Sequence, residues 1–261
     1  MTHALALLGL DVKMKLKRAV AFRFNFAVNL LIALLYSFVF SLFQFFVYSG
    51  VQGYPGWNTE QMLLFQAVLL LWTGVSDFLF GGIRQFIDNE VTYGNFDRFF
   101  LWPPHALVSL FTRGTNIYAS ATAFAGLVGV VVMLGRLGIT PGPASVATSL
   151  LFFASGLLFY VSLLIFYSAC TLFMVKMERL REVLDRVQFF GSFPADLYAG
   201  RLGSAFLLVF PMALWVHLPA QALLGRVELA AAGALLPTIA FFLAALCFWR
   251  RQERRYTSAG G

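Results

Sequence analysis

The residues of this sequence that could carry out chemistry are few, and they lie far apart. It has three histidines, His3, His105 and His217, and none has a second ligand at a spacing that binds a metal ion. No serine lies in a GxSxG nucleophile motif, and no GxxxxGK[ST] loop is present to cradle the phosphates of ATP. The sequence therefore predicts a chain without catalytic residues, bound metal or cofactor.

A charged and aromatic segment, IRQFIDNEVTYGNFDRFFLWPP at 83–104, separates two long apolar runs. Its first part predicts a short amphipathic helix, because its apolar residues fall on one face. These residues are Ile83, Phe86, Ile87 and Val91. Gly94 can adopt a positive φ and end that helix, and Pro103–Pro104 gives a rigid entry to the next run. A simple turn needs fewer residues, so this length and order indicate a docking element.

The composition indicates a membrane protein. The 261 residues are 60% hydrophobic and 12% charged, with a mean hydropathy of +0.78, whereas globular proteins carry roughly 25% charged residues because their surface faces water. The net charge is +7, but the basic residues lie at the ends of apolar runs, where phospholipid headgroups would face them. This placement predicts membrane lipid as a partner and argues against nucleic acid.

Six segments are long and apolar enough to cross a bilayer, which takes about 20 residues. Because backbone groups in lipid must be hydrogen-bonded within the segment, these spans are expected to be helices. The predicted spans are about 24–47, 61–82, 106–135, 145–175, 203–224 and 229–249. The sequence thus predicts an all-α integral membrane protein with six transmembrane helices, and residues 1–261 form a single domain with no nucleotide-binding domain.

Lysine and arginine alternate between the flanks of these spans. The flank before the first span and those after the second, fourth and sixth are rich in them, whereas each of the others has at most one. By the positive-inside rule, both termini are expected in the cytoplasm. Residues 4–20 have apolar side chains at helical spacing between lysines, which predicts an N-terminal interfacial helix, with a disordered basic tail as the alternative. A second surface helix is expected at 178–190.

Asp77 is the clearest acidic candidate within a predicted span. Ion-coupled carriers hold their ion or proton on such groups at mid-membrane, where a charge costs about 2.5–3.5 kcal/mol on insertion scales. Asp77 lies near one end of its span and can reach water, so it is a weak ion-relay candidate. With no energy source of its own, the chain would take the energy for uphill transport from a partner.

Three stretches together carry a family resemblance. AFRFNF at 21–26 is an aromatic and basic entry to the first span. YGNFDRFFLWPP at 93–104 has a glycine, two residues, an aspartate, a hydrophobic pair and then proline. FFGSFPADLY at 189–198 and FPMALWVHLPA at 210–220 combine an F-x-x-x-P…Y element with two further prolines. In this order and frame, the chain resembles the type-2 ABC exporter permeases, specifically the six-span bacterial permeases.

The resemblance implies a non-catalytic transport subunit in the bacterial cytoplasmic (inner) membrane. Such permeases are half-channels that pair with a second copy or a sister permease, and each docks a cytoplasmic ABC ATPase subunit that binds ATP and Mg²⁺. The residues then expected in the ATPase-coupling loop are Ile87, Asp88, Glu90, Gly94, Asp97, Arg98 and Pro103. Those expected in the translocation path or gate are Phe193, Pro194, Tyr198, Pro211 and Pro219.

A stand-alone membrane enzyme or scaffold acting on lipids is the alternative function. An enzyme would need converging polar groups inside the bilayer, and the sequence offers almost none. The substrate stays open. A phenylalanine-rich, charge-poor interior would suit an amphipathic or lipid-linked molecule, but phenylalanines facing lipid would give the same composition.

Overall fold

The computed structural model describes residues 2–50, 53–97, 99, 106–174, 178–198, 209–227 and 229–256. Its elements are α1 (Thr2–Ala21), α2 (Arg23–Gly50), α3 (Thr59–Phe80), α4 (Ile83–Thr92), α6 (Ala106–Arg113), η1 (Ile117–Ala119), α7 (Ser120–Arg136), α8 (Pro143–Met174), α9 (Glu178–Gly191), η2 (Ala195–Leu197), η3 (Met212–Leu214), α11 (His217–Leu223), η4 (Leu229–Ala234) and α12 (Leu235–Glu253), where η denotes a 3₁₀ helix. Within these residues the predicted all-α class is confirmed, since no strand occurs among them.

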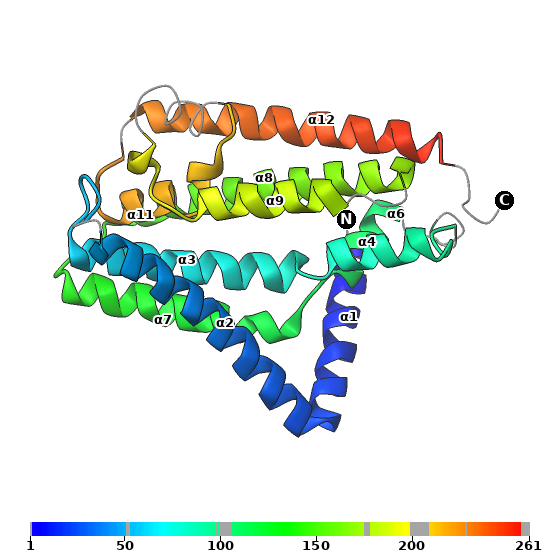
Figure 1. Cartoon of the computed structure of the whole chain (residues 1–261), viewed down its shortest axis with the longest axis horizontal. Coiled ribbons are helices and arrows are strands. Elements are labelled where there is room, and N and C mark those ends of the chain that lie inside the picture. Colours follow the sequence, from blue (N-terminus) through cyan, green and yellow to red (C-terminus); the bar gives the residue numbers. More distant parts are fainter. Residues whose placement is uncertain are drawn as a thin grey trace.

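Five helical stretches of the described residues are long and apolar enough to cross a membrane. They are Arg23–Gly50, Thr59–Thr92, Ile117–Arg136, Pro143–Met174 and Ala231–Glu253. The bundle has two tightly packed pairs, α3 with α7 and α8 with α12 (Figure 1). Helix α2 crosses the bundle obliquely, and α1 lies across the direction of the other helices. We call the two ends of the bundle the α4 end, which also holds α1 and α6, and the α11 end.

Small residues bring the backbones of α3 and α7 into direct contact. A Cβ atom on Gly74 would lie 2.1 Å from the backbone nitrogen of Ala123, and one on Gly126 would lie 2.1 Å from that of Leu71. Helices in lipid gain little from the hydrophobic effect when they associate, so they depend on close van der Waals contact of this kind. These glycines therefore hold α3, which carries much of the site described below, against α7.

The predicted third span, 106–135, is divided in two. Helix α6 ends at Arg113, and a turn leads into η1 and α7. In that turn the carbonyl of Gly114 accepts a hydrogen bond from the backbone N–H of Gly82, at 2.8 Å. The turn is thereby fixed to the junction of α3 and α4, and the candidate span starts only at Ile117.

The predicted fifth span, 203–224, is not one continuous helix. Residues 203–208 lie outside the described part of the chain. Beyond them, Pro211 precedes the short turn η3, and α11 has only 7 residues, too few to cross a bilayer. Val216 separates the two with φ −133° and ψ −47°, which is not a helical conformation. The segment turns within the α11 end.

Helix α9 forms where the sequence predicts a surface helix, but its direction differs. It runs along α8 instead of across the end of the bundle (Figure 1). Leu184 is buried in the core, and Asp185 pairs with Arg84 from α4. Because this ion pair compensates a charge on the inner face, a polar helix can pack along the apolar ones.

Candidate functional site

Helix α4 is attached to the bundle by its apolar face. Ile83, Ile87 and Val91 are at most 1% exposed, as their helical spacing predicts. Ile87 therefore faces the bundle, and a docked partner would not reach it. Gly94 has φ 65°, and its N–H donates to the carbonyl of Val91 at 3.1 Å. It ends the helix in the left-handed conformation that favours glycine.

Asp88 ties α4 to α8. The hydroxyl of Tyr167 lies 2.7 and 2.8 Å from the two carboxylate oxygens of Asp88, and an Arg181 nitrogen lies 3.9 Å away. Such charge-assisted hydrogen bonds are about twice as strong as neutral ones. Asp88 was expected to face an ATPase, but its carboxylate is engaged within the chain.

The loop after Gly94 packs on the end of α12. Phe96 is fully buried, with its ring centroid 6.3 Å from that of Trp249 and 5.6 Å from that of Tyr256. Burial, together with the neighbouring Asp97 carboxylate, raises the pKa of Tyr256 to about 12, so this hydroxyl stays protonated beside Asp97. The predicted coupling residues Arg98 and Pro103 lie outside the described residues.

The outward face of this segment is polar and uncharged. Its exposed residues are Gln85, Asn89, Thr92, Tyr93 and Asn95. Tyr93 is 74% exposed, and Glu90 is half-buried. A partner that docks at the α4 end would meet this face, with Tyr93 as its largest side chain.

The predicted path residues gather at the α11 end. Pro194 and Pro211 precede the turns η2 and η3, and the carbonyl of Pro219, in α11, accepts from the hydroxyl of Ser149 at 3.0 Å. The Tyr198 hydroxyl donates to the carbonyl of Phe190 at 3.1 Å. The ring of Phe193, which is half-buried, stacks edge-on against that of Phe189, with centroids 5.2 Å apart.

A buried histidine joins these two segments. Nδ1 of His217 accepts from the backbone N–H of Ala195 at 3.3 Å and lies 3.9 Å from the carboxylate of Asp196. That carboxylate also accepts from the indole of Trp57, at 2.7 Å, on the loop between α2 and α3. The cluster fixes three stretches of chain to one another, in keeping with a packing role for His217.

This cluster should make the protein less stable in acid. Burial lowers the pKa of His217, and the Asp196 carboxylate opposes that shift. The unfolded chain, with a histidine pKa of about 6.5, then binds more protons than the folded one, so stability is lost as the pH falls below that value. We expect a lower unfolding temperature at acidic pH in mild detergent, and a smaller pH effect in His217→Asn, which keeps an acceptor near Nδ1. An unchanged pH effect in the variant would contradict this assignment.

A cavity of about 460 Å³ lies between α2, α3 and α9, in the size range of small-molecule sites. None of the five predicted path residues lines it. Its polar lining includes Ser37, Ser41, Thr73, Ser76, Asp77 and Gln188. The ion pair between Arg84 and Asp185 lies at its α4 end, close enough to Asp77 for the charges to interact.

Behind the cavity, a buried chain of polar side chains links the three helices that form it. The side chain of Gln66 donates to that of Gln44 at 3.0 Å, and Gln44 donates to the hydroxyl of Ser192 at 2.9 Å. All three are at most 5% exposed. Polar groups at membrane depth are costly unless they pair with one another, so this chain fixes α9 to α2 and α3 in a set register.

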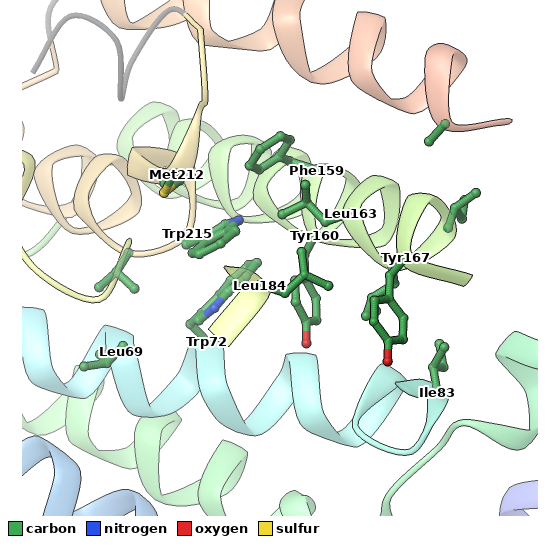
Figure 2. Close-up of a cluster of buried hydrophobic side chains, with 14 of the residues drawn as sticks. Leu69, Trp72, Ile83, Phe159, Tyr160, Leu163, Tyr167, Leu184, Met212 and Trp215 are labelled. Carbon is green, nitrogen blue, oxygen red and sulfur yellow. The ribbon is translucent and has the colours of Figure 1, made fainter. Parts of the chain in front are cut away.

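Aromatic rings form the apolar side of the cavity. The indoles of Trp72 and Trp215 are stacked, with centroids 5.6 Å apart and planes 12° apart (Figure 2). A Cβ atom on Gly191 would lie 2.4 Å from the ring of Trp215, so only glycine leaves room for this indole beside α9. The cavity thus combines stacked rings with hydroxyls, an amide and charged groups, which suits a molecule with apolar and polar parts.

A signal for this cavity was present in the sequence. Ser37, Ser41 and Gln44 recur at helical spacing in α2, and Thr73 and Asp77 do so in α3. Hydroxyl and amide groups on one face of an apolar span mark the face turned away from lipid. The neighbouring stretch of α9 could not be found in this way, because its direction is not evident from its sequence.

Comparison with known proteins places the chain in a family. The family model described as ABC-2 family transporter protein matches residues 31–260, which is most of the chain. No curated protein and no solved structure matches it. The match agrees with the apolar helices that suggest a multi-pass membrane protein and with the three stretches that carry the resemblance. The chain belongs to the ABC-2 family of transporter membrane proteins.

Proposed function

We propose that this chain is the permease subunit of an ATP-driven ABC exporter of the bacterial inner membrane. It forms half of a translocation path with a second copy or a sister permease, and it docks a separate ATPase at the α4 end. The observation that carries this proposal is the segment from α4 to Phe96. One face of it is buried on α8 and α12, whereas the other is exposed and polar.

The proposed orientation places the α4 end in the cytoplasm, with both termini there. Basic residues near this end include Lys15, Arg18, Arg84, Arg113, Arg181 and Arg250, whereas Arg136 and Arg226 lie at the α11 end. This distribution supports the orientation, because cytoplasmic flanks are rich in lysine and arginine. Helix α9 with η2 supplies the sixth crossing, and α1 lies along the cytoplasmic membrane surface.

Movement of an ATPase would enter through rigid contacts. A push on α4 reaches α8 through Asp88 and Tyr167, α9 through Arg84 and Asp185, and α12 through Phe96. The pair between α4 and α9 also borders the cavity. Docking can therefore alter the cavity directly, provided that α9 has two arrangements for the ATPase to select between.

Copurification tests the proposal. The tagged chain, extracted in mild detergent from its native host, should bring down a soluble subunit with a P-loop, and ATP hydrolysis should require the complex. A chain that stays alone and turns over a lipid substrate by itself would overturn the proposal in favour of a membrane enzyme. A chain that stays alone without any turnover would leave the scaffold reading and equally contradict it.

The exposed face of α4 provides a sharper test. Tyr93→Ala should weaken ATPase association several-fold, since large aromatic side chains dominate many interfaces, while the unfolding temperature of the permease stays unchanged. Phe124→Ala, which removes a ring that is 68% exposed on α7, is the matched control and should leave association intact. Equal association of both variants with the ATPase would place the docking surface elsewhere.

A further inference from the structure

A second pocket, of about 450 Å³, lies at the α4 end. It is bounded by the last turns of α1, the first turn of α2, the junction of α3 and α4, and the segment 115–118. Nothing in the proposed transport path uses it, because the cavity beside α9 is formed by other faces of these helices.

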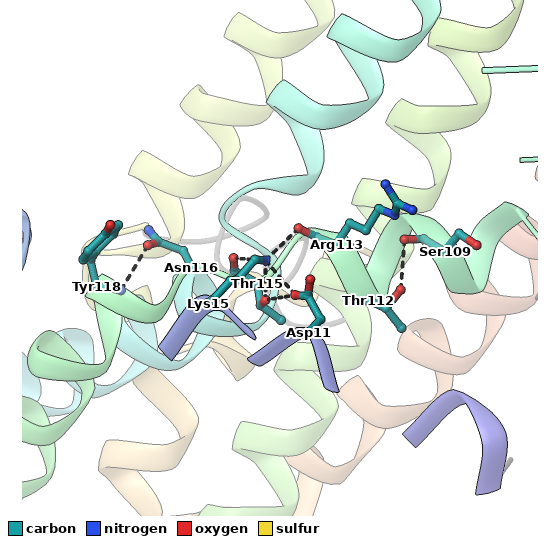
Figure 3. A network of polar contacts seen from close by, with 8 residues as sticks. All are labelled: Asp11, Lys15, Ser109, Thr112, Arg113, Thr115, Asn116 and Tyr118. Carbon is teal, nitrogen blue, oxygen red and sulfur yellow. Dashed lines mark hydrogen bonds and ion pairs between the residues drawn. The ribbon is translucent and has the colours of Figure 1, made fainter. Parts of the chain in front are cut away.

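Lys15 fixes α1 as one wall of this pocket. Its ammonium donates to the carbonyls of Arg113 and Thr115 at 3.0 and 2.8 Å and to the Thr115 hydroxyl at 2.6 Å (Figure 3). It also pairs with Asp11 at 2.8 Å. The charge of Lys15 is therefore compensated, and α1 is anchored where α6 ends.

The remaining polar groups of the pocket are hydrogen-bond donors. Arg18 follows Lys15 by one helical turn, and no aspartate or glutamate is among the described residues that line the pocket. The side-chain oxygens of Asn25 and Asn116 already accept, from the Asn29 amide at 2.9 Å and from a backbone N–H at 3.2 Å. Each asparagine thus offers its NH₂ group. Together with the Arg18 guanidinium, these groups are suited to an anion.

The surroundings of the pocket are those of a membrane interface. Phe22, which lines it, and the adjacent Phe24 are 69% and 84% exposed, and the ring of Phe26 lies 5.8 Å from that of Tyr118. Aromatic residues of this kind concentrate at headgroup level. Next to the pocket, the N-terminal half of α2 exposes apolar side chains, including Leu31, Ile32 and Leu35. A ligand with acyl chains would find a surface for them there.

We propose that this pocket binds the phosphate of an anionic glycerophospholipid, such as phosphatidylglycerol. The guanidinium of Arg18 pairs with the phosphate, and the amides of Asn25, Gln85 and Asn116 donate to it or to the headgroup hydroxyls. The acyl chains lie along α2. The bound lipid joins α1 and α2, which make few contacts with the bundle at this end, to the junction of α3 and α4.

The test titrates the full-length chain in neutral detergent with phosphatidylglycerol or phosphatidylcholine and follows lipid retention by native mass spectrometry together with the unfolding temperature. Phosphatidylglycerol should be retained and should raise the unfolding temperature more than phosphatidylcholine does. Arg18→Gln should weaken its apparent affinity roughly fivefold, as expected for the loss of one charge-assisted contact. The matched control is Lys17→Gln, which removes a charge from the exposed face of the same helix and should change little.

Further arms keep the outcome decisive. Gln85→Leu removes a donor without altering the charge and should also weaken retention, so it serves if Arg18→Gln does not fold. Equal retention of both lipids, or equal effects of Arg18→Gln and Lys17→Gln, would overturn the proposal in favour of general surface electrostatics. Full displacement of the lipid by millimolar inorganic phosphate would show a free-anion site and overturn it too. Transport is not measured, so the result stands apart from the exporter assignment.

Discussion

Replacing Gly126 by leucine should abolish the stably folded protein. A single Cβ atom at this position would lie 2.1 Å from the backbone nitrogen of Leu71 and 2.5 Å from its Cα atom. No rotamer change relieves a contact with backbone, so α3 and α7 would have to move apart. The neighbouring contact at Gly74 would then open as well. We expect the yield of monodisperse protein in mild detergent to fall by roughly tenfold.

Helix α7 itself offers the matched control. A Cβ atom on Gly135 would meet nothing within 4 Å among the described residues, so Gly135→Leu adds the same side chain without the clash and should purify like the wild type. Gly126→Ala should lie between the two. Size-exclusion profiles and unfolding temperatures provide the measurement. A Gly126→Leu variant that behaves like Gly135→Leu would mean that α3 and α7 are not in backbone contact.

The expected effect is large because α3 faces both α7 and the cavity. Its small residues lie against α7, while Thr73, Ser76 and Asp77 line the cavity. Rotation of α3 to accommodate a larger residue would move those polar groups away from α9. Close helix contact and cavity geometry are thus two consequences of one sequence pattern.

Hydropathy predicts the long helices of this fold well and their interruptions poorly. The range 145–175 coincides with α8 almost throughout, because an uninterrupted apolar run in lipid can only be helical. The run from 106 looks equally continuous, yet it breaks after Arg113, where Gly114 bonds to Gly82. That break depends on a contact made in three dimensions, which periodicity along the chain does not reveal.

The candidate site was predictable to a similar extent. The apolar face and terminating glycine of α4 followed from local spacing and from the conformational freedom of Gly94. That Asp88 would be engaged by Tyr167, leaving Tyr93 as the exposed feature, depends on residues 79 positions apart. Likewise, the prolines at 211 and 219 marked an unusual segment, but hydropathy assigned it a full crossing because it does not register where a helix turns back.

Phe96→Ala should release the coupling segment from α12 and abolish most transport. The ring is fully buried between Phe99, Trp249 and Tyr256, and removal of such a ring costs about 3–5 kcal/mol in protein cores. This loss falls on a short segment that only local contacts hold in place. We therefore expect faster hydrogen exchange in residues 83–97 and a strong loss of transport in the assembled complex, with normal membrane insertion.

Comparison with Tyr93→Ala separates two ways of losing transport. Tyr93→Ala should leave hydrogen exchange at 83–97 as in the wild type while ATPase association falls, because its side chain contributes little to the bundle. Phe96→Ala should speed exchange first, and any ATPase that still binds would then push on a segment that no longer transmits force to α12. If Phe96→Ala kept wild-type exchange and transport rates, the contact with α12 would not be part of the route, and coupling would have to run through Asp88 and Arg84 alone.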